Sequence, residues 1–227
     1  MRIFLDTANL GDIRYFNEYF PIEGVTTNPT ILSKERGNVV KHLKAIREII
    51  GADKELHVQV TETRCDEIIE EAKALVELLG KNTYVKIPVT DEGLKATRLL
   101  SKMGYKVTVT AILTAAQALL AANSGAAYVA PYVSRLENVF GDGVGTVAEI
   151  AKILKASNSK TQILAASFKT AREALDCSLV ECHCATIGAD ILARFLKHAT
   201  TNSSISGFEK DWQEAFGETT LLKLIKG

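Results

Sequence analysis

The chain has 227 residues, with 27 basic and 27 acidic side chains, so its formal net charge at neutral pH is zero. A chain of this length buries a sizeable core and fits a single domain. Balanced charge produces no overall field that would attract DNA, RNA or an anionic membrane surface. Nucleic acid is therefore not expected as a partner, and any site for an anion must be local.

The N-terminal segment has one basic residue and a short apolar run that ends at Asp6. A signal peptide needs a longer apolar stretch and a cleavage site, and no later segment reaches the ~20 apolar residues of a membrane span. Four cysteines in a chain of this length are too few for a disulfide framework. We therefore expect a cytoplasmic protein with no membrane association.

Eight short runs of apolar and β-branched residues recur along the chain, and they occupy residues 3–5, 24–27, 57–60, 84–87, 107–110, 128–131, 162–165 and 185–188. Amphipathic patterns separate them, as where Ile68, Ala72, Leu75 and Leu79 repeat at intervals of three and four residues. Eight strand–loop–helix units with right-handed crossovers predict an α/β fold of the (β/α)₈ (TIM) barrel type.

Capping boxes predict where three helices begin, because a hydroxyl and a Glu or Gln three residues later satisfy the first free backbone N–H groups. The pairs are Thr114 with Gln117, Thr146 with Glu149, and Thr170 with Glu173. A doubly wound open sheet is the alternative fold. The even spacing of the runs and the absence of a glycine-rich dinucleotide fingerprint after the first run favour the barrel.

Two further segments are interpreted from their composition. Residues 141–145, GDGVG, lack the lysine of a Walker motif and are predicted to form a loop. Residues 208–216 predict a final amphipathic helix that carries Trp212. We expect one domain over residues 1–227, in which the helix and tail at 207–227 cover the mouth of the barrel or pack on a neighbouring subunit.

Three cysteines and a histidine lie close together in the sequence, at Cys177, Cys182, His183 and Cys184. Structural zinc sites have a second spaced pair of ligands, and none is visible here. Buried cysteines behave as small apolar residues. We therefore interpret these cysteines as core residues and expect neither a metal nor another cofactor.

Lys86 stands inside the predicted strand VKIPV at 85–89. Barrel strands are buried on both faces, so a lysine there loses hydration, and this loss lowers its pKa toward that of a nucleophile. The alternatives are a buried stem whose amine reaches water, or a structural ion pair.

Polar residues also stand in or directly after most of the other predicted strands, namely Asp6, Thr27, Asn28, Gln59, Thr110, Tyr132 and Ser167. Helix capping explains several of them singly, but it does not explain a lysine. The carboxyl ends of barrel strands form the face that carries active sites. An amine near a carboxylate, an amide and a phenol can condense with a ketone, so a carbonyl substrate is expected.

A local cationic and hydroxyl group, made by Arg135, Ser167 and Lys169, follows the sixth and seventh predicted strands. Such side chains suit the oxygens of a phosphate. The alternative is that Arg135 and Lys169 are ordinary solvated surface charges.

Four motifs together resemble the transaldolase family, and in particular its short-form subfamily, which includes fructose-6-phosphate aldolase. The motifs are GVTTNP at 24–29, VKIPVT at 85–90, APYVSR at 130–135 and AASFK at 165–169. The resemblance covers the whole chain, including the predicted helix with FEKDW at 208–212.

The resemblance implies a metal-free class I aldolase that cleaves or forms fructose 6-phosphate from dihydroxyacetone and glyceraldehyde 3-phosphate. Lys86 would form the Schiff base and Tyr132 would be the general acid and base, with Gln59 and Thr110 holding a catalytic water. By the same resemblance the remaining site residues are Asp6 and Asn28 at the donor hydroxyls, Thr27 in the pocket wall, and Arg135, Ser167 and Lys169 at the phosphate.

Two positions separate the possible activities. Transaldolases of this family typically have Glu where this chain has Gln59, and Phe where it has Tyr132. A phenol can protonate the enamine and release the donor as a ketone, so the pair favours aldolase.

The alternatives are a transaldolase that moves a dihydroxyacetone unit between sugar phosphates, such as sedoheptulose 7-phosphate and glyceraldehyde 3-phosphate, and a non-catalytic sugar-phosphate-binding barrel. An aldolase with acetaldehyde as donor is disfavoured, because it would leave Asp6 and Asn28 without partners. The resemblance also implies a homo-oligomer, a pentamer or decamer.

Overall fold

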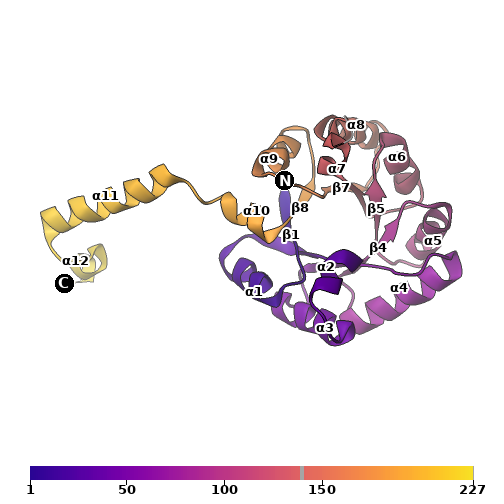
Figure 1. Cartoon of the computed structure of the whole chain (residues 1–227), viewed down its shortest axis with the longest axis horizontal. Coiled ribbons are helices and arrows are strands. Elements are labelled where there is room, and N and C mark those ends of the chain that lie inside the picture. Colours follow the sequence, from indigo (N-terminus) through magenta and orange to yellow (C-terminus); the bar gives the residue numbers. More distant parts are fainter. Residues whose placement is uncertain (139–140, 227) are drawn as a thin grey trace. The chain divides into compact units, whose positions relative to one another are not determined.

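The computed structural model describes residues 1–138 and 141–226. Eight parallel strands close into a barrel in chain order, and helices alternate with them around the outside (Figure 1). The strands are β1 (Arg2–Asp6), β2 (Ile22–Thr26), β3 (Glu55–Gln59), β4 (Thr83–Pro88), β5 (Val107–Ile112), β6 (Tyr128–Pro131), β7 (Gln162–Ala165) and β8 (Cys184–Ile187). Each lies where an apolar run predicts it, and the prediction of a (β/α)₈ barrel is confirmed.

The helices around the barrel place apolar faces against the strands, except for the short α2, which has no buried residue. They are α1 (Leu10–Tyr19), α2 (Pro29–Lys34), α3 (Val39–Ile50), α4 (Cys65–Leu79), α5 (Asp91–Lys102), α6 (Ala115–Asn123), α7 (Val133–Glu137), α8 (Gly143–Ala156), α9 (Ala171–Leu179) and α10 (Ala189–Arg194). In α4, for example, the buried residues Ile68, Ala72 and Leu79 follow the predicted helical spacing.

The chain divides into two compact units, Met1–Leu192 and Ala193–Gly227. The second unit holds α11 (Ala199–Phe216) and α12 (Leu221–Lys226). Helix α11 is longer than the predicted span of 208–216. Within this unit the indole of Trp212 donates to the carbonyl of Thr219 at 2.8 Å and its ring lies 4.6 Å from that of Phe216. The second unit thus makes a small cluster of its own.

Two of the three predicted capping boxes are present, at Thr114 with Gln117 and at Thr170 with Glu173. The third prediction is wrong, because α8 begins earlier. Asp142 caps α8 by accepting from the backbone N–H of Gly145 at 2.6 Å, so residues 143–145 form its first turn instead of a loop. A Cβ at Gly143 would lie 2.4 Å from the carbonyl oxygen of Val133, so the absent side chain lets α8 start against α7.

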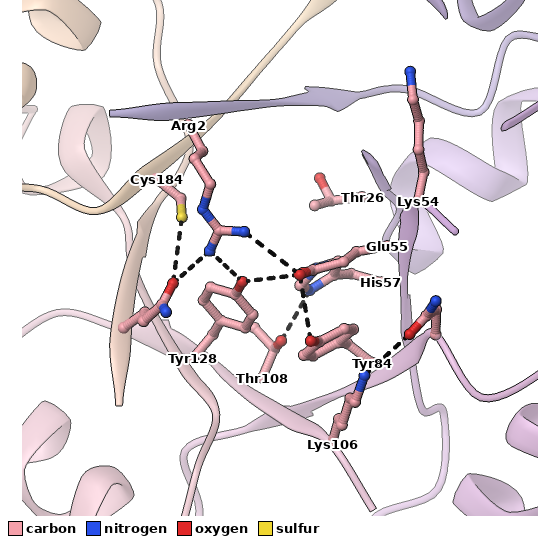
Figure 2. Close-up of polar contacts among 12 residues, drawn as sticks. Arg2, Thr26, Lys54, Glu55, His57, Tyr84, Lys106, Thr108, Tyr128 and Cys184 are labelled. Atoms are coloured by element: carbon pink, nitrogen blue, oxygen red, sulfur yellow. Dashed lines mark hydrogen bonds and ion pairs between the residues drawn. The ribbon is translucent and has the colours of Figure 1, made fainter. Parts of the chain in front are cut away.

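A polar network fills the amino-terminal end of the barrel interior (Figure 2). Arg2 donates to the hydroxyl of Tyr128 at 2.6 Å and also to Gln162. The hydroxyls of Tyr84 and Tyr128 donate to the same oxygen of Glu55, at 3.3 and 3.2 Å. These contacts join residues from five strands and close that end of the barrel.

His57 lies two residues after Glu55 on β3, stacks on the ring of Tyr84 and is fully buried. Its ring nitrogens lie 3.2 Å from Glu55 Oε2 and 2.9 Å from Thr108 Oγ1. Burial lowers the pKa of His57 to about 4, although the carboxylate of Glu55 acts in the opposite direction. The imidazole is therefore neutral at physiological pH.

Candidate active site

Lys86 occupies the interior of β4, in register with Gln59 of β3. The residue is only 6% exposed, and its amine donates to the backbone carbonyl of Thr27 at 2.8 Å. This burial does not fit the alternative of an amine extended into water. Burial lowers the pKa of Lys86, while the nearby charge of Asp6 raises it. A neutral amine is the form that attacks a carbonyl.

Asp6 ends β1 and does not cap a helix. Its carboxylate accepts from the hydroxyl of Thr26 at 2.6 Å, and that hydroxyl also contacts Thr186 of β8. Burial raises the pKa of Asp6, while Lys86 and the bond from Thr26 lower it. Thr26 and Thr186 were not predicted as site residues, because threonine is common in β-strands. The alternation of side chains along a strand, which turns every second residue toward the barrel interior, is the sequence pattern that could have indicated them.

Thr27 and Asn28 lie directly after β2. The backbone N–H and the hydroxyl of Thr27 both donate to the carbonyl of His57, at 2.9 and 3.1 Å. These bonds fix the backbone of Thr27, whose own carbonyl accepts from Lys86. Asn28 caps α2 by accepting from Ile31 at 2.9 Å. The side-chain oxygen of Asn28 therefore caps a helix, as the capping alternative predicts. The NH₂ group of the same side chain remains able to donate to a ligand.

Thr110, Tyr132 and Arg135 come together across β5 and β6. The hydroxyl of Thr110 donates to that of Tyr132 at 3.3 Å. The guanidinium carbon of Arg135 lies 4.6 Å from the centre of the Tyr132 ring. Thr110 is also in register with Pro88, two residues after Lys86, so the phenol and the amine belong to the same end of the barrel.

Ser167 follows β7 with a left-handed backbone, at a φ of +64°. Ala111 on β5 has a φ of +60°. Such values are uncommon for residues other than glycine, and strained backbone concentrates at functional sites. The carbonyl of Ser167 accepts from the backbone N–H of Ser134 at 3.1 Å, which brings the segments of Arg135 and Lys169 together. Both cations are exposed at the mouth of the barrel.

A cavity of about 340 Å³ opens beside this group of residues. It lies between Gln59 and the α2–α3 segment, and Pro29, Leu32, Val39 and His42 are among its lining residues. Among the predicted site residues only Gln59 reaches it. The space is therefore adjacent to the predicted site and does not enclose it.

The cysteines lie in the core. Cys65, Cys177, Cys182 and Cys184 are buried thiols, and burial raises the pKa of Cys182 to about 11 and those of Cys177 and Cys184 to about 12. Within residues 1–138 and 141–226 no group of three or more His, Cys, Asp or Glu side chains could hold a metal ion. No helix in the same ranges is long and apolar enough to cross a membrane.

Most of the predicted site residues thus lie in barrel strands or within two residues of a strand end, namely Lys86, Asp6, Thr27, Asn28, Gln59, Thr110, Tyr132 and Ser167. Arg135 lies in α7, and Lys169 lies in the loop between β7 and α9. A comparison with protein families gives a match to the model for transaldolase/fructose-6-phosphate aldolase over residues 3–223, nearly the whole chain. The chain, an enzyme with this barrel and this buried lysine, therefore belongs to the transaldolase/fructose-6-phosphate aldolase family.

Proposed function

We propose that the protein is a class I aldolase that cleaves and forms fructose 6-phosphate through a Schiff base on Lys86. The observation that carries the proposal is the buried amine of Lys86, with its lowered pKa, at the carboxyl ends of the barrel strands. Dihydroxyacetone and glyceraldehyde 3-phosphate are the products of cleavage and the substrates of synthesis.

In cleavage, the amine of Lys86 adds to the C2 carbonyl of the sugar, and the carbinolamine loses water to give an iminium. The bond between C3 and C4 then breaks as the C4 hydroxyl loses its proton, which releases the aldehyde and leaves an enamine. Tyr132 receives that proton through a water held by Gln59 and Thr110, and returns it to the enamine carbon. Water then hydrolyses the iminium and frees the ketone.

The remaining residues bind the substrate. Asp6 and the amide of Asn28 hold the hydroxyls of the donor, and Thr27 forms part of the pocket wall. Arg135, Ser167 and Lys169 hold the phosphate, because a guanidinium, a hydroxyl and an ammonium are the donors that a phosphate accepts. The contact between the guanidinium of Arg135 and the ring of Tyr132 supports an arrangement in which the acid–base group lies beside the phosphate.

The first experiment measures release of glyceraldehyde 3-phosphate from fructose 6-phosphate, with and without erythrose 4-phosphate. Release without the acceptor supports aldolase and the roles given to Gln59 and Tyr132. Release only with the acceptor identifies a transaldolase, in which the enamine waits for a second aldehyde, and overturns the argument from these two residues.

Borohydride reduction with dihydroxyacetone tests the covalent step that both activities share. The adduct is expected on Lys86 by peptide mapping, and Lys86→Met should abolish both the adduct and turnover while leaving the far-ultraviolet circular dichroism unchanged. The exposed Lys102→Met on α5 is the control. No adduct at Lys86 in the wild-type protein would indicate a barrel that binds sugar phosphates without catalysis.

We further propose that the protein acts in the cytoplasm as a homo-oligomer, a pentamer or decamer, in which the helix and tail at 207–227 pack on a neighbouring subunit. Exposed apolar side chains in the second unit support this proposal, among them Phe208, Phe216 and Ile225. Light scattering of the full chain measures the number of subunits, and a monomer would contradict the proposal.

A further inference from the structure

Glu173 joins two segments that lie far apart in the sequence. One oxygen of its carboxylate accepts three hydrogen bonds, from the hydroxyl of Ser134 at 2.8 Å, the backbone N–H of Lys169 at 2.8 Å and that of Thr170 at 3.0 Å. Ser134 is 1% exposed and immediately precedes Arg135. The carboxylate therefore connects the start of α7 to the loop between β7 and α9.

A second capping box in the same barrel shows what is unusual about this arrangement. In α6, the side-chain oxygen of Gln117 accepts from the backbone N–H groups of Leu113 and Thr114, at 2.8 and 3.2 Å. Those two bonds correspond to the bonds that Glu173 accepts from Lys169 and Thr170. Within the described chain, the α6 box has no counterpart of the bond from Ser134. Capping α9 alone therefore does not require that third bond.

The segments that Glu173 connects carry the side chains assigned above to the phosphate. Arg135 follows Ser134 on α7, and Lys169 belongs to the loop after Ser167. Backbone bonds already tie α7 to β7, from Val133 to the carbonyl of Ala166 at 2.9 Å and from Ser134 to that of Ser167. Glu173 adds a connection between α7 and the two residues that precede α9, which fixes the backbone of Lys169 relative to α7.

We propose that Glu173 is a positioning residue for the phosphate of the aldehyde substrate, which it serves through Ser134 and the backbone of Lys169 and Thr170. The inference rests on the proposed function and names the part of the substrate that these segments recognise. The carboxylate accepts from the backbone N–H groups of Lys169 and Thr170, which directly precede α9. In this proposal the phosphate is held by the side chains of Arg135, Ser167 and Lys169.

The test compares two aldehydes that differ only in the phosphate. Dihydroxyacetone is added to glyceraldehyde 3-phosphate and to unphosphorylated glyceraldehyde by the full-length enzyme and by Glu173→Ala, Glu173→Gln and Ser134→Ala. For Glu173→Ala and Ser134→Ala the KM for the phosphorylated aldehyde should rise about tenfold, equivalent to ~1.4 kcal/mol, with kcat changed less. The kcat/KM for glyceraldehyde should change less than about twofold, since a hydrogen bond acts only on the groups it positions.

Glu173→Gln should recover most of the affinity, because its amide oxygen can accept the same three bonds. Gln117→Ala is the matched control, since it removes a capping box from α6 without touching the phosphate segments; it should affect both aldehydes equally. Inhibition by inorganic phosphate gives a second readout, and its inhibition constant should rise in Glu173→Ala and Ser134→Ala in step with the KM.

Equal losses on both aldehydes, or no change in either, would overturn the positioning role. Should Glu173→Ala fail to fold, Ser134→Ala decides the question, because it keeps both bonds of the α9 capping box. If the wild-type enzyme itself gives no aldol product with glyceraldehyde 3-phosphate, the proposed function fails, and this result is distinct from failure of the role of Glu173.

Discussion

Lys86 and Asp6 act on each other's protonation inside the barrel. Burial disfavours the charged form of both groups, so it lowers the pKa of the amine and raises that of the carboxyl. The attraction between the two charges acts in the opposite direction on each. The pH dependence of the proposed reaction should therefore depend on Asp6, although Lys86 is the residue proposed to form the covalent bond.

Asp6→Asn removes the negative charge that raises the pKa of Lys86, so that pKa should fall further. The neutral amine then persists to lower pH, and the acid limb of the pH profile of kcat/KM should move to lower pH. Borohydride trapping of dihydroxyacetone as a function of pH measures the same shift. Glu23→Gln, which neutralises an exposed carboxylate on β2, is the control and should leave the limb in place.

Tyr132→Phe removes the phenol but keeps the ring that Arg135 contacts. Cleavage of fructose 6-phosphate should fall by about a hundredfold or more, the typical contribution of a positioned acid or base. The adduct between Lys86 and dihydroxyacetone should still form, and transfer to an added aldehyde should increase relative to cleavage. Unchanged cleavage by Tyr132→Phe, or an equal loss in the exposed Tyr19→Phe, would remove the acid–base role.

At the level of residues, the sequence allows prediction of groups whose chemistry is out of place in a buried strand. Lys86 is the clearest, because no packing rule accounts for a lysine there. Thr26 and Glu173 could not be selected, since strand composition explains the first and helix capping the second. Ser134 lies in the short helix α7 and has no pattern in the sequence that marks it. Their importance depends on contacts with residues far away in the sequence, such as the bond from Ser134 to Glu173.

At the level of elements, periodicity predicts the strands and most helices of the barrel. The start of α8 could not be predicted, because it depends on the close approach of Gly143 to Val133 of α7, a contact that composition does not show. Helix α5 depends on a similar approach. A Cβ at Gly93 would lie 2.2 Å from the carbonyl oxygen of Pro88, at the end of the strand that carries Lys86.

Gly93→Ala should therefore destabilise the protein, although alanine favours helices. The clash with the backbone of Pro88 should cost roughly 1–3 kcal/mol, more than the ~1 kcal/mol gained in helix propensity. Urea unfolding measures the difference. Gly207→Ala in α11 is the matched control, because nothing lies within 4 Å of its Cβ, and it should not destabilise the protein. A more stable Gly93→Ala would show that α5 is free to move away from β4.

At the level of the whole molecule, the network around Glu55 and His57 links the stability of the barrel to pH. The native His57 has a pKa of about 4, below the ordinary value of 6.5 that it regains on unfolding. Between these two values the unfolded chain binds a proton that the native protein does not bind. Stability should therefore fall as the pH decreases from about 6.5 to about 4.

Within this window His57 should add a slope of up to ~1.4 kcal/mol per pH unit to the free energy of unfolding. Above pH 6.5 that slope should fall to zero, because neither state then binds the proton. Glu55, Arg2 and Lys86 are the charged groups that act on the imidazole. His57→Gln removes the titrating group, so the slope of the unfolding free energy against pH should be smaller in this variant between those pH values. The same slope in both proteins would indicate that the loss of stability on acidification comes from the carboxylates alone.

The polar network at the amino-terminal end of the barrel also bears on the expected order of product release. Because Arg2, Glu55 and Tyr128 fill that end, we expect a substrate to reach Lys86 from the opposite end, where Arg135 and Lys169 are exposed. In the proposed reaction the ketone fragment is bound to Lys86, so we expect the aldehyde to depart first and the ketone last. Dihydroxyacetone should then inhibit cleavage competitively with fructose 6-phosphate, whereas glyceraldehyde 3-phosphate should inhibit it noncompetitively, as initial-rate measurements can show.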